Sequence, residues 1–429
     1  MSTRLRCLLA ASAVALTAAC GVGDQAGSNT VTMTVWTSNQ AQLDLLNRLA
    51  DDFSAQHDGA DVRIQSVPQA DYTTKISVRL AGGDAPDLGW LGAPDAVGMA
   101  ASGQLADVGP ALRNDPEYRF DDFVPAAFTN WRGGDAVYGV PFSTSPFFVI
   151  YNKDAFATAN LPEPAELAAR GDWTWDRLAG LARDLQPSLP RGHFVFQSNE
   201  GSVYGPLPVS WPTLDPLLRA HGAGFYDPQT KRCTLDSPAA AEAVGTFHRM
   251  AFDDRTAVPP GAQADFYAGN AAMTITQLSR LSQLEGAEFD YGIAPLPGGP
   301  GGQPHVTGQA GLVVFEQAPH KELATELLKY LTSEKAVREL AEFYPPARTS
   351  VLADAPEIYR DSRLSEQAVK DILVPGITEG HAFQYPRTWP EIKTTAQPVF
   401  DQLWSPGADV GSVLGRLCGE VGPLLKQAE

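Results

Sequence analysis

The first part of the chain alternates between strand and helix, and this order restricts the fold more than any other feature of the sequence. Apolar residues that alternate with polar ones predict a strand at 30–36, and apolar residues at helical spacing predict a helix at 41–55. A second strand follows at 62–67, then a helix at 72–81 and a strand at 87–91. Strand, helix and strand in so few residues form a right-handed parallel crossover, which is the unit of an open α/β sheet.

The rest of the chain is rich in helices whose starts are set by capping residues. Ser237 followed by Pro238 is a strong helix start, because serine caps the first free amides and proline fits the first turn. Ser333 separates two later helices in the same way. The helices that we predict here are 173–185, one that starts at 238, 321–331, 334–343 and 410–427.

The N-terminus has the order of an export signal. Arg4 and Arg6 supply positive charge, and 7–19 is apolar or small, too short to be a stable membrane anchor. The run ends at Cys20 and resembles the lipobox of bacterial lipoproteins, in which the cysteine is lipidated and becomes the first residue. Thr17 stands where that motif usually has leucine. Plain cleavage just before the cysteine, without a lipid, is the alternative.

The length and the net charge of the chain limit the number of domains and the kinds of partner that we expect. About 410 residues remain after the leader, more than one hydrophobic core usually serves, so we expect two domains. The formal net charge is −18, and it is about −20 without the two arginines of the leader. So acidic a surface repels nucleic acid and anionic membranes, and we expect neither as a partner. No later stretch is apolar for long enough to span a membrane.

Two cysteines remain after the leader, Cys233 and Cys418. Outside the cell an isolated pair favours a disulfide, which here would close a long loop and restrain the C-terminal segment. Two buried, reduced thiols are the alternative. Their spacing excludes a cysteine metal cluster.

The sequence lacks the motifs of the common hydrolases and nucleotide-binding enzymes. There is no H-E-x-x-H, no G-x-S-x-G and no phosphate-binding loop, and the seven histidines are scattered. We expect no catalytic residue, no metal and no cofactor. The paired carboxylates of a glycosidase are defined by their separation in space, so a secreted glycoside-active enzyme is the alternative.

Seven short motifs occur in an order that resembles the extracellular solute-binding proteins of carbohydrate ABC importers, the maltose-binding-protein type. No single motif is specific, but together they cover residues 30–400 behind the lipobox. The motifs are Val35-Trp36-Thr37, Gly83-Asp84-Ala85-Pro86-Asp87, Gly139-Val140-Pro141-Phe142, Tyr151-Asn152-Lys153-Asp154, the segment 269–275, the segment 291–297 and the helix 321–331.

The resemblance implies an α/β fold of the periplasmic-binding-protein type II, with two discontinuous lobes, a hinge and an interlobe cleft. The chain would cross between the lobes near 141–146, 298–303 and 345–349. The expected divisions are 1–19 for a signal peptide, 20–29 for a lipidated tether, 30–143 plus 303–345 for the N-terminal lobe, and 146–300 plus 348–429 for the C-terminal lobe.

The resemblance also places ligand contacts at the carboxyl ends of strands and in the linkers, where sugar hydroxyls meet groups that donate and accept hydrogen bonds. Helix capping is the alternative for Asn39 and Asp95, and an interlobe salt bridge is the alternative for Arg348. We expect Trp36 to pack within its strand rather than to stack on a ligand. The candidates in the N-terminal lobe and the linkers are Asn39, Gln40, Asp95, Ser143, Ser145, Gly308, Gln309, Tyr344 and Arg348.

Two departures from the family pattern affect the ligand. Relatives have an acid in the first linker and often an aromatic residue after the strand that ends at Ile275, and this chain has neither. Trp389 lies near the place of another stacking tryptophan, with a core role as the alternative. The candidates in the C-terminal lobe are Asn199, Glu200, Trp211, Gln277, Ser279 and Trp389.

We therefore expect a monomeric lipoprotein that captures an oligosaccharide or amino sugar and passes it to the permease of an ABC importer. The alanine- and arginine-rich composition suggests a mycobacterial or actinobacterial amino-sugar uptake system. A glycerophosphodiester receptor of the same fold is the alternative within the family.

Overall fold

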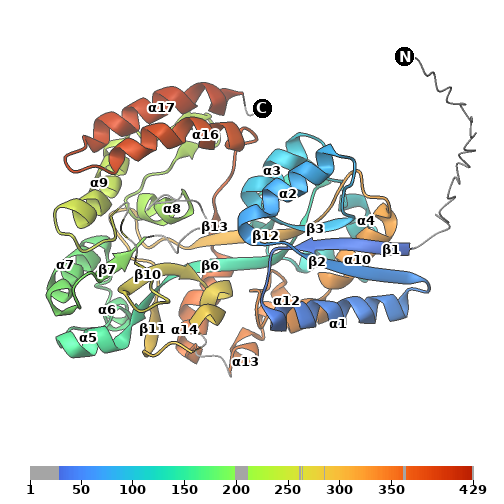
Figure 1. Ribbon diagram of the computed structural model, residues 1–429, viewed down its shortest axis with the longest axis horizontal. Helices are drawn as coiled ribbons and strands as arrows, with labels where there is room; N and C mark the ends of the chain where they lie inside the picture. The colour runs from blue at the N-terminus through green and yellow to red at the C-terminus, as the bar shows by residue number, and fades with distance from the viewer. Residues whose placement is uncertain are drawn as a thin grey trace, which may run out of the picture.

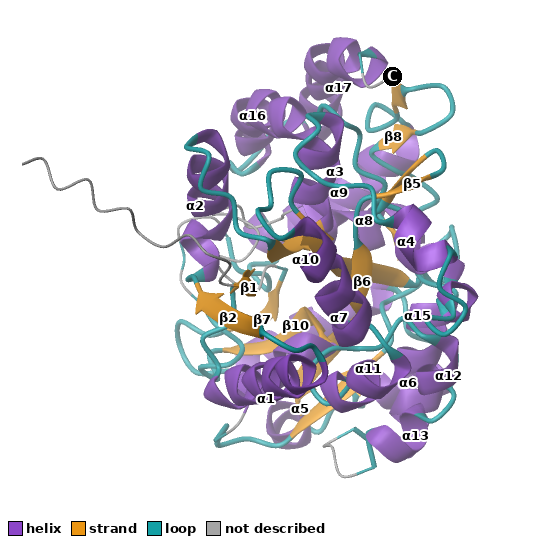
Figure 2. Cartoon of the chain, turned by 90° about the vertical axis from the view of Figure 1, so that its right-hand side faces the viewer, coloured by secondary structure: helices purple, strands orange, loops and turns teal. Residues whose placement is uncertain are grey.

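The computed structural model of the chain describes residues 29–198, 211–259, 262, 264–284, 286–360 and 364–427. Figure 1 shows two α/β lobes side by side, joined by strands that run between them. Nine of the described strands form one sheet in the order β2-β1-β3-β12-β6-β10-β7, with β11 on β6 and β13 on β12, and two further strand pairs, β4-β5 and β8-β9, lie outside it. Most helices lie on the outside of these strands (Figure 2). The expected two-lobed α/β class is confirmed.

The first lobe begins with the predicted crossover units. β1 (Asn29–Val35) lies between β2 (Ala60–Ser66) and β3 (Leu88–Gly92) and is parallel to both. α1 (Gln40–Gln56) and α2 (Gln69–Ala81) connect them. Each element lies within three residues of its predicted bounds, because its apolar periodicity is uninterrupted.

Further helices and a small hairpin complete this lobe and extend beneath the strands. The bounds are α3 (Ala93–Ala101), α4 (Gly109–Arg113), β4 (Arg132–Gly133), β5 (Ala136–Val137), α10 (Lys321–Leu331), α11 (Glu334–Leu340), α12 (Thr349–Leu352), α13 (Ala355–Ile358), α14 (Glu366–Ala368) and α15 (Val374–Thr378).

The second lobe holds the remaining helices and strands. Ser237 accepts a hydrogen bond from a backbone amide at the start of its α9, as the capping pattern predicts, and Thr174 caps α7 in the same way. The bounds are α5 (Lys153–Ala159), α6 (Pro164–Ala169), α7 (Trp175–Leu185), β7 (Phe194–Gln197), α8 (Trp211–Ala220), β8 (Tyr226–Asp227), β9 (Arg232–Cys233), α9 (Pro238–Phe252), β10 (Ala271–Gln277), the 3₁₀ helix η5 (Leu278–Leu284), β11 (Tyr291–Ala294), α16 (Trp389–Phe400) and α17 (Val410–Lys426).

β6 (Val140–Asn152) is the first connection between the lobes. Its residues 140–146 pair with β12 (Val306–Val314) on the first lobe's side, and residues 147–152 pair with β10 and β11 on the other. One continuous strand therefore belongs to both lobes. β12 provides the second connection immediately after the glycine- and proline-rich segment.

The third connection differs from the expected one near 345–349. The backbone of 345–349 bonds within the first lobe, where the Pro345 carbonyl accepts from the Thr144 amide. Buried side chains from Leu352 to Ile377 then join the larger hydrophobic cluster, which holds the first lobe's core together with Leu278 and Leu284 of η5, and those from Phe383 onward join the second lobe's core. The chain crosses at β13 (His381–Ala382), which pairs with β12. Proline at 345 and 346 interrupts the helix without ending the lobe, because distant residues hold this segment.

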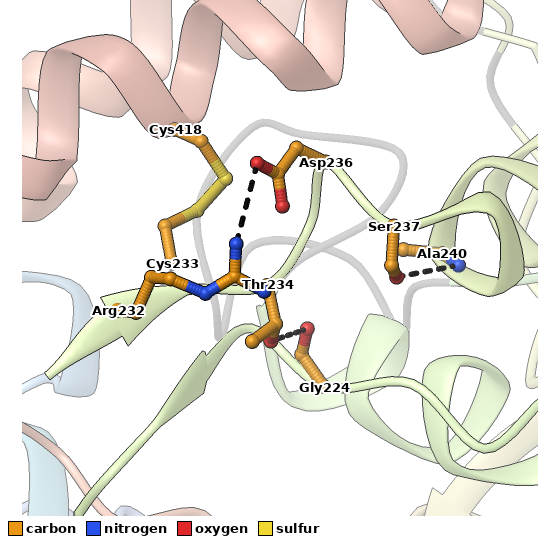
Figure 3. The surroundings of a disulfide bond; sticks show 8 residues. All are labelled: Gly224, Arg232, Cys233, Thr234, Asp236, Ser237, Ala240 and Cys418. Atoms are coloured by element: carbon orange, nitrogen blue, oxygen red, sulfur yellow. Dashed lines mark hydrogen bonds and ion pairs between the residues drawn. A yellow bond between two sulfur atoms is a disulfide. The ribbon is translucent and has the colours of Figure 1, made fainter. Parts of the chain in front are cut away.

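A disulfide joins Cys233 of β9 to Cys418 of α17, with 5.3 Å between their Cα atoms (Figure 3). It fastens the C-terminal helix to the second lobe across 185 residues of sequence. Within the part of the chain that the structure describes, no helix combines the length and apolar character needed to cross a membrane.

Candidate ligand-binding cleft

A cavity of about 640 Å³ lies where the two lobes face each other. The first lobe contributes residues that follow β1 and β3 at their carboxyl ends, the usual place for a ligand in an open α/β sheet. The second lobe contributes residues of α8, of η5 and of the segment 382–385. The volume is in the range of small-molecule sites.

The first lobe lines the cavity with a cluster of five aromatic rings. Trp90 and Phe142 stack with their ring centres 4.6 Å apart, and Tyr344 meets both edge-on at 5.3 Å. Trp36 meets Trp90 and Tyr72 edge-on, also at 5.3 Å. All five residues line the cavity, and Trp36 is the most exposed of them. This wall can pack against the apolar face of a flat or ring-shaped ligand.

Asn130 connects this wall to aromatic residues of the second lobe. Its Nδ2 donates to the Phe383 carbonyl over 2.9 Å, and its Oδ1 accepts from the Tyr385 amide over 3.1 Å. Nδ2 also reaches Oε1 of Gln309, whose own Nε2 donates to the Ala126 carbonyl. Asn130 and Gln309 therefore line the cavity while most of their amide groups hold the backbone in place.

The floor of the cavity is formed where β6, β12 and β10 meet. Ser143 and Ser145 of β6 and Gly308 of β12 line it together with Gln277, the last residue of β10. Nε2 of Gln277 donates to the Ser145 carbonyl over 3.1 Å. These groups are hydroxyls, amides and backbone, which can both donate and accept.

Among the residues that the structure describes, two carboxyl groups line the cavity, one from each lobe. Asp95 stands in the first turn of α3 and accepts a hydrogen bond of 2.9 Å from the Thr73 hydroxyl. Asp215 of α8 is 2% exposed, and its Oδ2 accepts from Nε of Arg219 over 2.8 Å. Burial raises the pKa of both carboxyls, and Arg219 opposes that rise at Asp215.

Residues 37–338 match the family model described as bacterial extracellular solute-binding protein, which is more than half of the chain. This chain is a bacterial extracellular solute-binding protein. It is similar to the maltotriose-binding protein of Pyrococcus abyssi, with 25% identity over 76% of this chain and 68% of that protein. It is also similar to an uncharacterized lipoprotein of Streptomyces antibioticus, with 24% identity over 71% of this chain and 68% of that one.

The solved structures show the same fold. An ABC substrate-binding protein of Listeria monocytogenes, in complex with cycloalternan, superimposes with a TM-score of 0.79 at 19% identity. The match covers 92% of this chain and 99% of that one. The family and the fold that the motif order indicates are thus confirmed for this solute-binding protein.

The cavity brings together most of the predicted contacts whose side chains the structure describes. Asn39 both lines the cavity and caps α1, because its Oδ1 accepts from the Gln42 amide. Asn199 and Glu200 lie outside the described residues, and the side chains of Trp211 and Ser279 are not described. The predicted residues in the lining are Asn39, Asp95, Ser143, Ser145, Gln277, Gly308, Gln309 and Tyr344.

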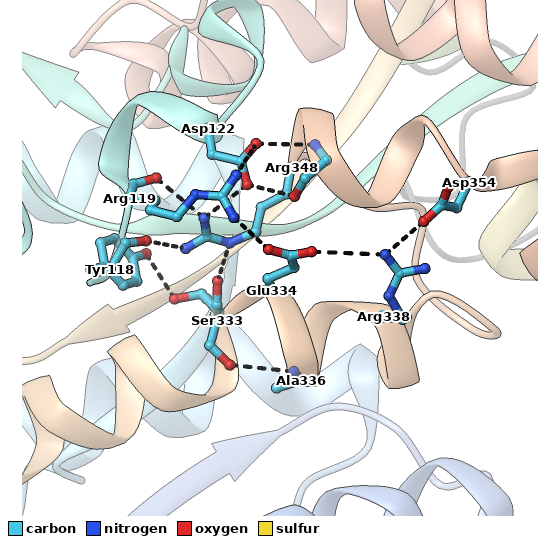
Figure 4. Close-up of polar contacts among 11 residues, drawn as sticks. Tyr118, Arg119, Asp122, Ser333, Glu334, Ala336, Arg338, Arg348 and Asp354 are labelled. Atoms are coloured by element: carbon cyan, nitrogen blue, oxygen red, sulfur yellow. Dashed lines mark hydrogen bonds and ion pairs between the residues drawn. The ribbon is translucent and has the colours of Figure 1, made fainter. Parts of the chain in front are cut away.

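Arg348 is not in the lining, which corrects the expected ligand contact. It is 1% exposed and makes an ion pair of 3.2 Å with Asp122. Its guanidinium also donates to the carbonyls of Tyr118, Arg119 and Thr332 (Figure 4). The salt bridge is within the first lobe rather than between lobes. A guanidinium with this many acceptors has a structural role.

Two further candidates also lie outside the lining. Trp389 is 4% exposed and packs its ring against Phe383 and Tyr385, which themselves line the cavity. Gln40 lies on the exposed side of α1 and donates to Asp44. Trp389 therefore supports the wall from behind, and Gln40 bonds to its own helix rather than lining the cavity.

Sequence reasoning missed Asp215 and every ring of the aromatic wall except Tyr344. Trp36 was expected to pack in its strand, but β1 ends one residue earlier, so its ring reaches the cavity. The signal was available, since Trp36 directly follows the end of β1 and Trp90 lies in the adjacent strand β3. Asp215 is a single acid in a helical segment, and nothing in the local sequence indicates that it lines a cavity.

Proposed function

We propose that this solute-binding protein is the receptor of an ABC importer and captures a sugar or sugar derivative in the interlobe cavity. The observation that carries the proposal is the pairing of an aromatic wall with a polar floor in one cavity. A sugar ring has an apolar face of C–H groups and a rim of hydroxyls. The five rings of the first lobe suit the face, and the hydroxyls and amides of β6, β12 and Gln277 suit the rim.

The position of the cavity supports hinge closure as the mechanism. Its lining comes from both lobes, which are joined by three strands, β6, β12 and β13. A ligand that contacts both lobes binds the closed arrangement more tightly than the open one and so shifts the population toward it. The closed form then presents the solute to the permease, and opening releases it.

The relatives support a carbohydrate as the ligand class. One is a maltotriose-binding protein, and one solved structure of the same fold holds cycloalternan. This chain differs from the maltose type by the residues at its linker, Ser143 and Ser145, where relatives have an acid. We infer an oligosaccharide or amino sugar other than maltose as the natural solute, bound by a protein that acts as a monomer without catalysis.

We further infer export and lipid anchoring at Cys20, which lies outside the described residues. The leader sequence and the relative named as a lipoprotein support this inference. Labelling of producing cells with radioactive palmitate should mark the wild-type protein, and Cys20→Ala should remove the label. An unlabelled wild-type protein would favour plain secretion instead.

The central test is binding without turnover. Residues 29–429 are titrated with maltose, maltotriose and trehalose by calorimetry, and the mixture is analysed by chromatography after incubation. Glucose and N-acetylglucosamine are titrated in the same way. We expect saturable binding of at least one sugar, no change in the sugar, and a smaller radius of gyration in X-ray scattering. Absence of binding to all five sugars would contradict the proposal, and hydrolysis would favour a glycoside-active enzyme.

A further inference from the structure

Asp215 is the one acidic residue that the second lobe contributes to the cavity within the described part of the chain. It lies in the middle of α8 and is 2% exposed, a degree of burial at which an aspartate is rare unless it is paired. Arg219, one turn later on the same helix, provides that pair at 2.8 Å. The ion pair therefore explains how the charge is tolerated in the wall.

The pair uses only one of the two carboxylate oxygens. Oδ2 accepts from Arg219, whereas Oδ1 is buried and has no hydrogen-bond partner among the described residues. A buried acceptor without a donor is costly, since water would otherwise supply the hydrogen bond. Because Arg219 already offsets the charge, Oδ1 lacks a donor rather than a second positive charge.

The charges around the cavity indicate what kind of donor this is. Of the described residues in the lining, three carry a charge: Asp95, Asp215 and Arg280. Arg219 pairs with Asp215 and Arg280 also lines the cavity, so the two carboxylates do not make the lining negative overall. The free Oδ1 therefore selects as a hydrogen-bond acceptor: a phosphate or carboxylate oxygen has no proton to donate to it at neutral pH, whereas a sugar hydroxyl has one.

We propose that Asp215 is a specificity-determining residue whose Oδ1 accepts a hydrogen bond from a hydroxyl of a neutral sugar, and that this acceptor disfavours a phosphate group at the same place. This inference rests on the proposed function and narrows its ligand class. It sets neutral sugars apart from the glycerophosphodiesters considered for the same fold.

Asp215→Asn is an informative change because it reverses the hydrogen-bonding character of the free atom. A guanidinium only donates, so the amide oxygen of the variant will face Arg219. The NH₂ group then takes the place of Oδ1 and presents a donor to a sugar hydroxyl that is itself oriented to donate. The side chain keeps its size, so the shape of the wall is preserved.

The test compares wild type, Asp215→Asn and the control Asp184→Asn, an exposed residue of α7 in the same lobe. Each protein is titrated with maltose, maltotriose and trehalose, and with trehalose 6-phosphate and glycerophosphocholine. For the best neutral sugar we expect Asp215→Asn to weaken binding about tenfold or more, the value of a hydrogen bond to a charged group. Asp184→Asn should bind like wild type, and trehalose 6-phosphate should bind wild type at least about tenfold more weakly than trehalose.

The outcomes separate this inference from the proposed function. Wild-type binding of a neutral sugar with unchanged affinity in Asp215→Asn would overturn the role of Asp215 alone. Tighter wild-type binding of trehalose 6-phosphate or glycerophosphocholine than of any neutral sugar would overturn the preference of this acceptor for a hydroxyl over a phosphate. Binding of no compound would overturn the proposed function and this inference with it. Circular dichroism checks folding, and Asp215→Glu, which shifts the carboxylate by one methylene, replaces the Asn variant if that fails to fold.

Discussion

Gln277 reaches from the end of β10 to the backbone of Ser145 in β6, with 3.1 Å between its Nε2 and the carbonyl oxygen. Gly308 of β12 lies directly beside this bond, and a Cβ atom at 308 would collide with Nε2 of Gln277. The three strands therefore meet at a point where one of them has no side chain. Gln277 of the second lobe therefore touches both β6 and β12, which are the first two connections between the lobes.

Gly308→Ala should weaken ligand binding. The added methyl group would displace the Gln277 amide from the Ser145 carbonyl. Gln277 and Gly308 both line the cavity, so the displaced amide would change its surface. Loss of one hydrogen bond predicts a roughly two- to tenfold higher Kd, with steric obstruction adding to it. Calorimetry with the best sugar ligand measures the effect. Gly419→Ala in α17, where a Cβ meets open space, should leave the Kd unchanged, and equal affinities in the two variants would refute the argument.

Replacement of two tryptophans should separate ligand contact from core packing. Trp36→Ala removes the most exposed ring of the aromatic wall, so we expect an affinity loss of about 1–3 kcal/mol with a small change in Tm. Trp389→Ala empties a site in the core that is 4% exposed, so we expect a loss of about 3–5 kcal/mol in the free energy of unfolding.

Calorimetric titration and urea unfolding of both variants measure these effects. A reversed pattern, with Trp36→Ala unstable and Trp389→Ala deficient only in binding, would return the stacking role to Trp389.

Arg348→Met should destabilise the first lobe without changing the chemistry of the cavity. The change leaves Asp122 without its buried partner and leaves the carbonyls of Tyr118 and Thr332 without their donor. Burial alone would raise the pKa of Asp122, but hydrogen bonds from Ser350 and Arg348 outweigh it and hold that pKa below its usual value. Breaking such a pair costs about 3–5 kcal/mol.

Denaturant unfolding of Arg348→Met measures this cost. Arg360→Met, which removes an exposed ion pair with Glu357, is the matched control and should change stability by less than about 1 kcal/mol. An affinity loss in Arg348→Met larger than its loss of stability would instead support a ligand contact.

The disulfide should contribute to stability through the long loop that it closes. Cys233 and Cys418 are 185 residues apart, and loop-closure entropy for such a separation gives at most about 5 kcal/mol. We expect the double variant Cys233→Ala/Cys418→Ala to have a lower Tm while binding sugar with unchanged affinity, because neither residue lines the cavity. An unchanged Tm, or the presence of two titratable thiols in the oxidised wild type, would contradict this prediction.

Local signals in the sequence predicted the elements well, because they act within a few residues. Ser333 caps α11 through the Ala336 amide, and the apolar spacing of α10 reproduces its bounds. Such contacts lie within one helical turn, so the pattern contains them in full. The family resemblance supplied the two-lobed arrangement that periodicity alone leaves open.

Local sequence patterns could not predict contacts between residues that are far apart in the chain. Arg348 follows two prolines and looks like part of a linker, yet its partners Tyr118 and Asp122 stand more than 220 positions earlier. Asp215 looks like an ordinary surface acid of a helix, and only the packing of the second lobe places it in the cavity wall. The predicted loop residues reached the cavity because strand ends gather at one edge of the sheet, whereas these two depended on the tertiary fold.

His381 of β13 should make the stability of the protein sensitive to mild acid. Burial, together with the positive charge of Arg219, lowers its pKa from 6.5 to about 4. The folded state therefore favours the neutral ring, and the unfolded chain binds the proton first as the pH falls. The stabilisation is complete above pH 6.5 and is lost as the pH falls toward 4. The slope is below about 1.4 kcal/mol per pH unit, since the exposed part of the ring keeps some of its hydration.

His381→Asn should flatten the decline in Tm between pH 6.5 and 4, because a neutral amide replaces the ring that must stay neutral in the fold. His193→Asn, in the turn before β7, controls for the loss of a histidine elsewhere. Thermal melts at half-unit pH steps compare the three proteins. Since β13 is one of the three connections between the lobes, a proton on His381 would also weaken the strand about which they move. Identical pH profiles for wild type and His381→Asn would show that the acid sensitivity arises elsewhere.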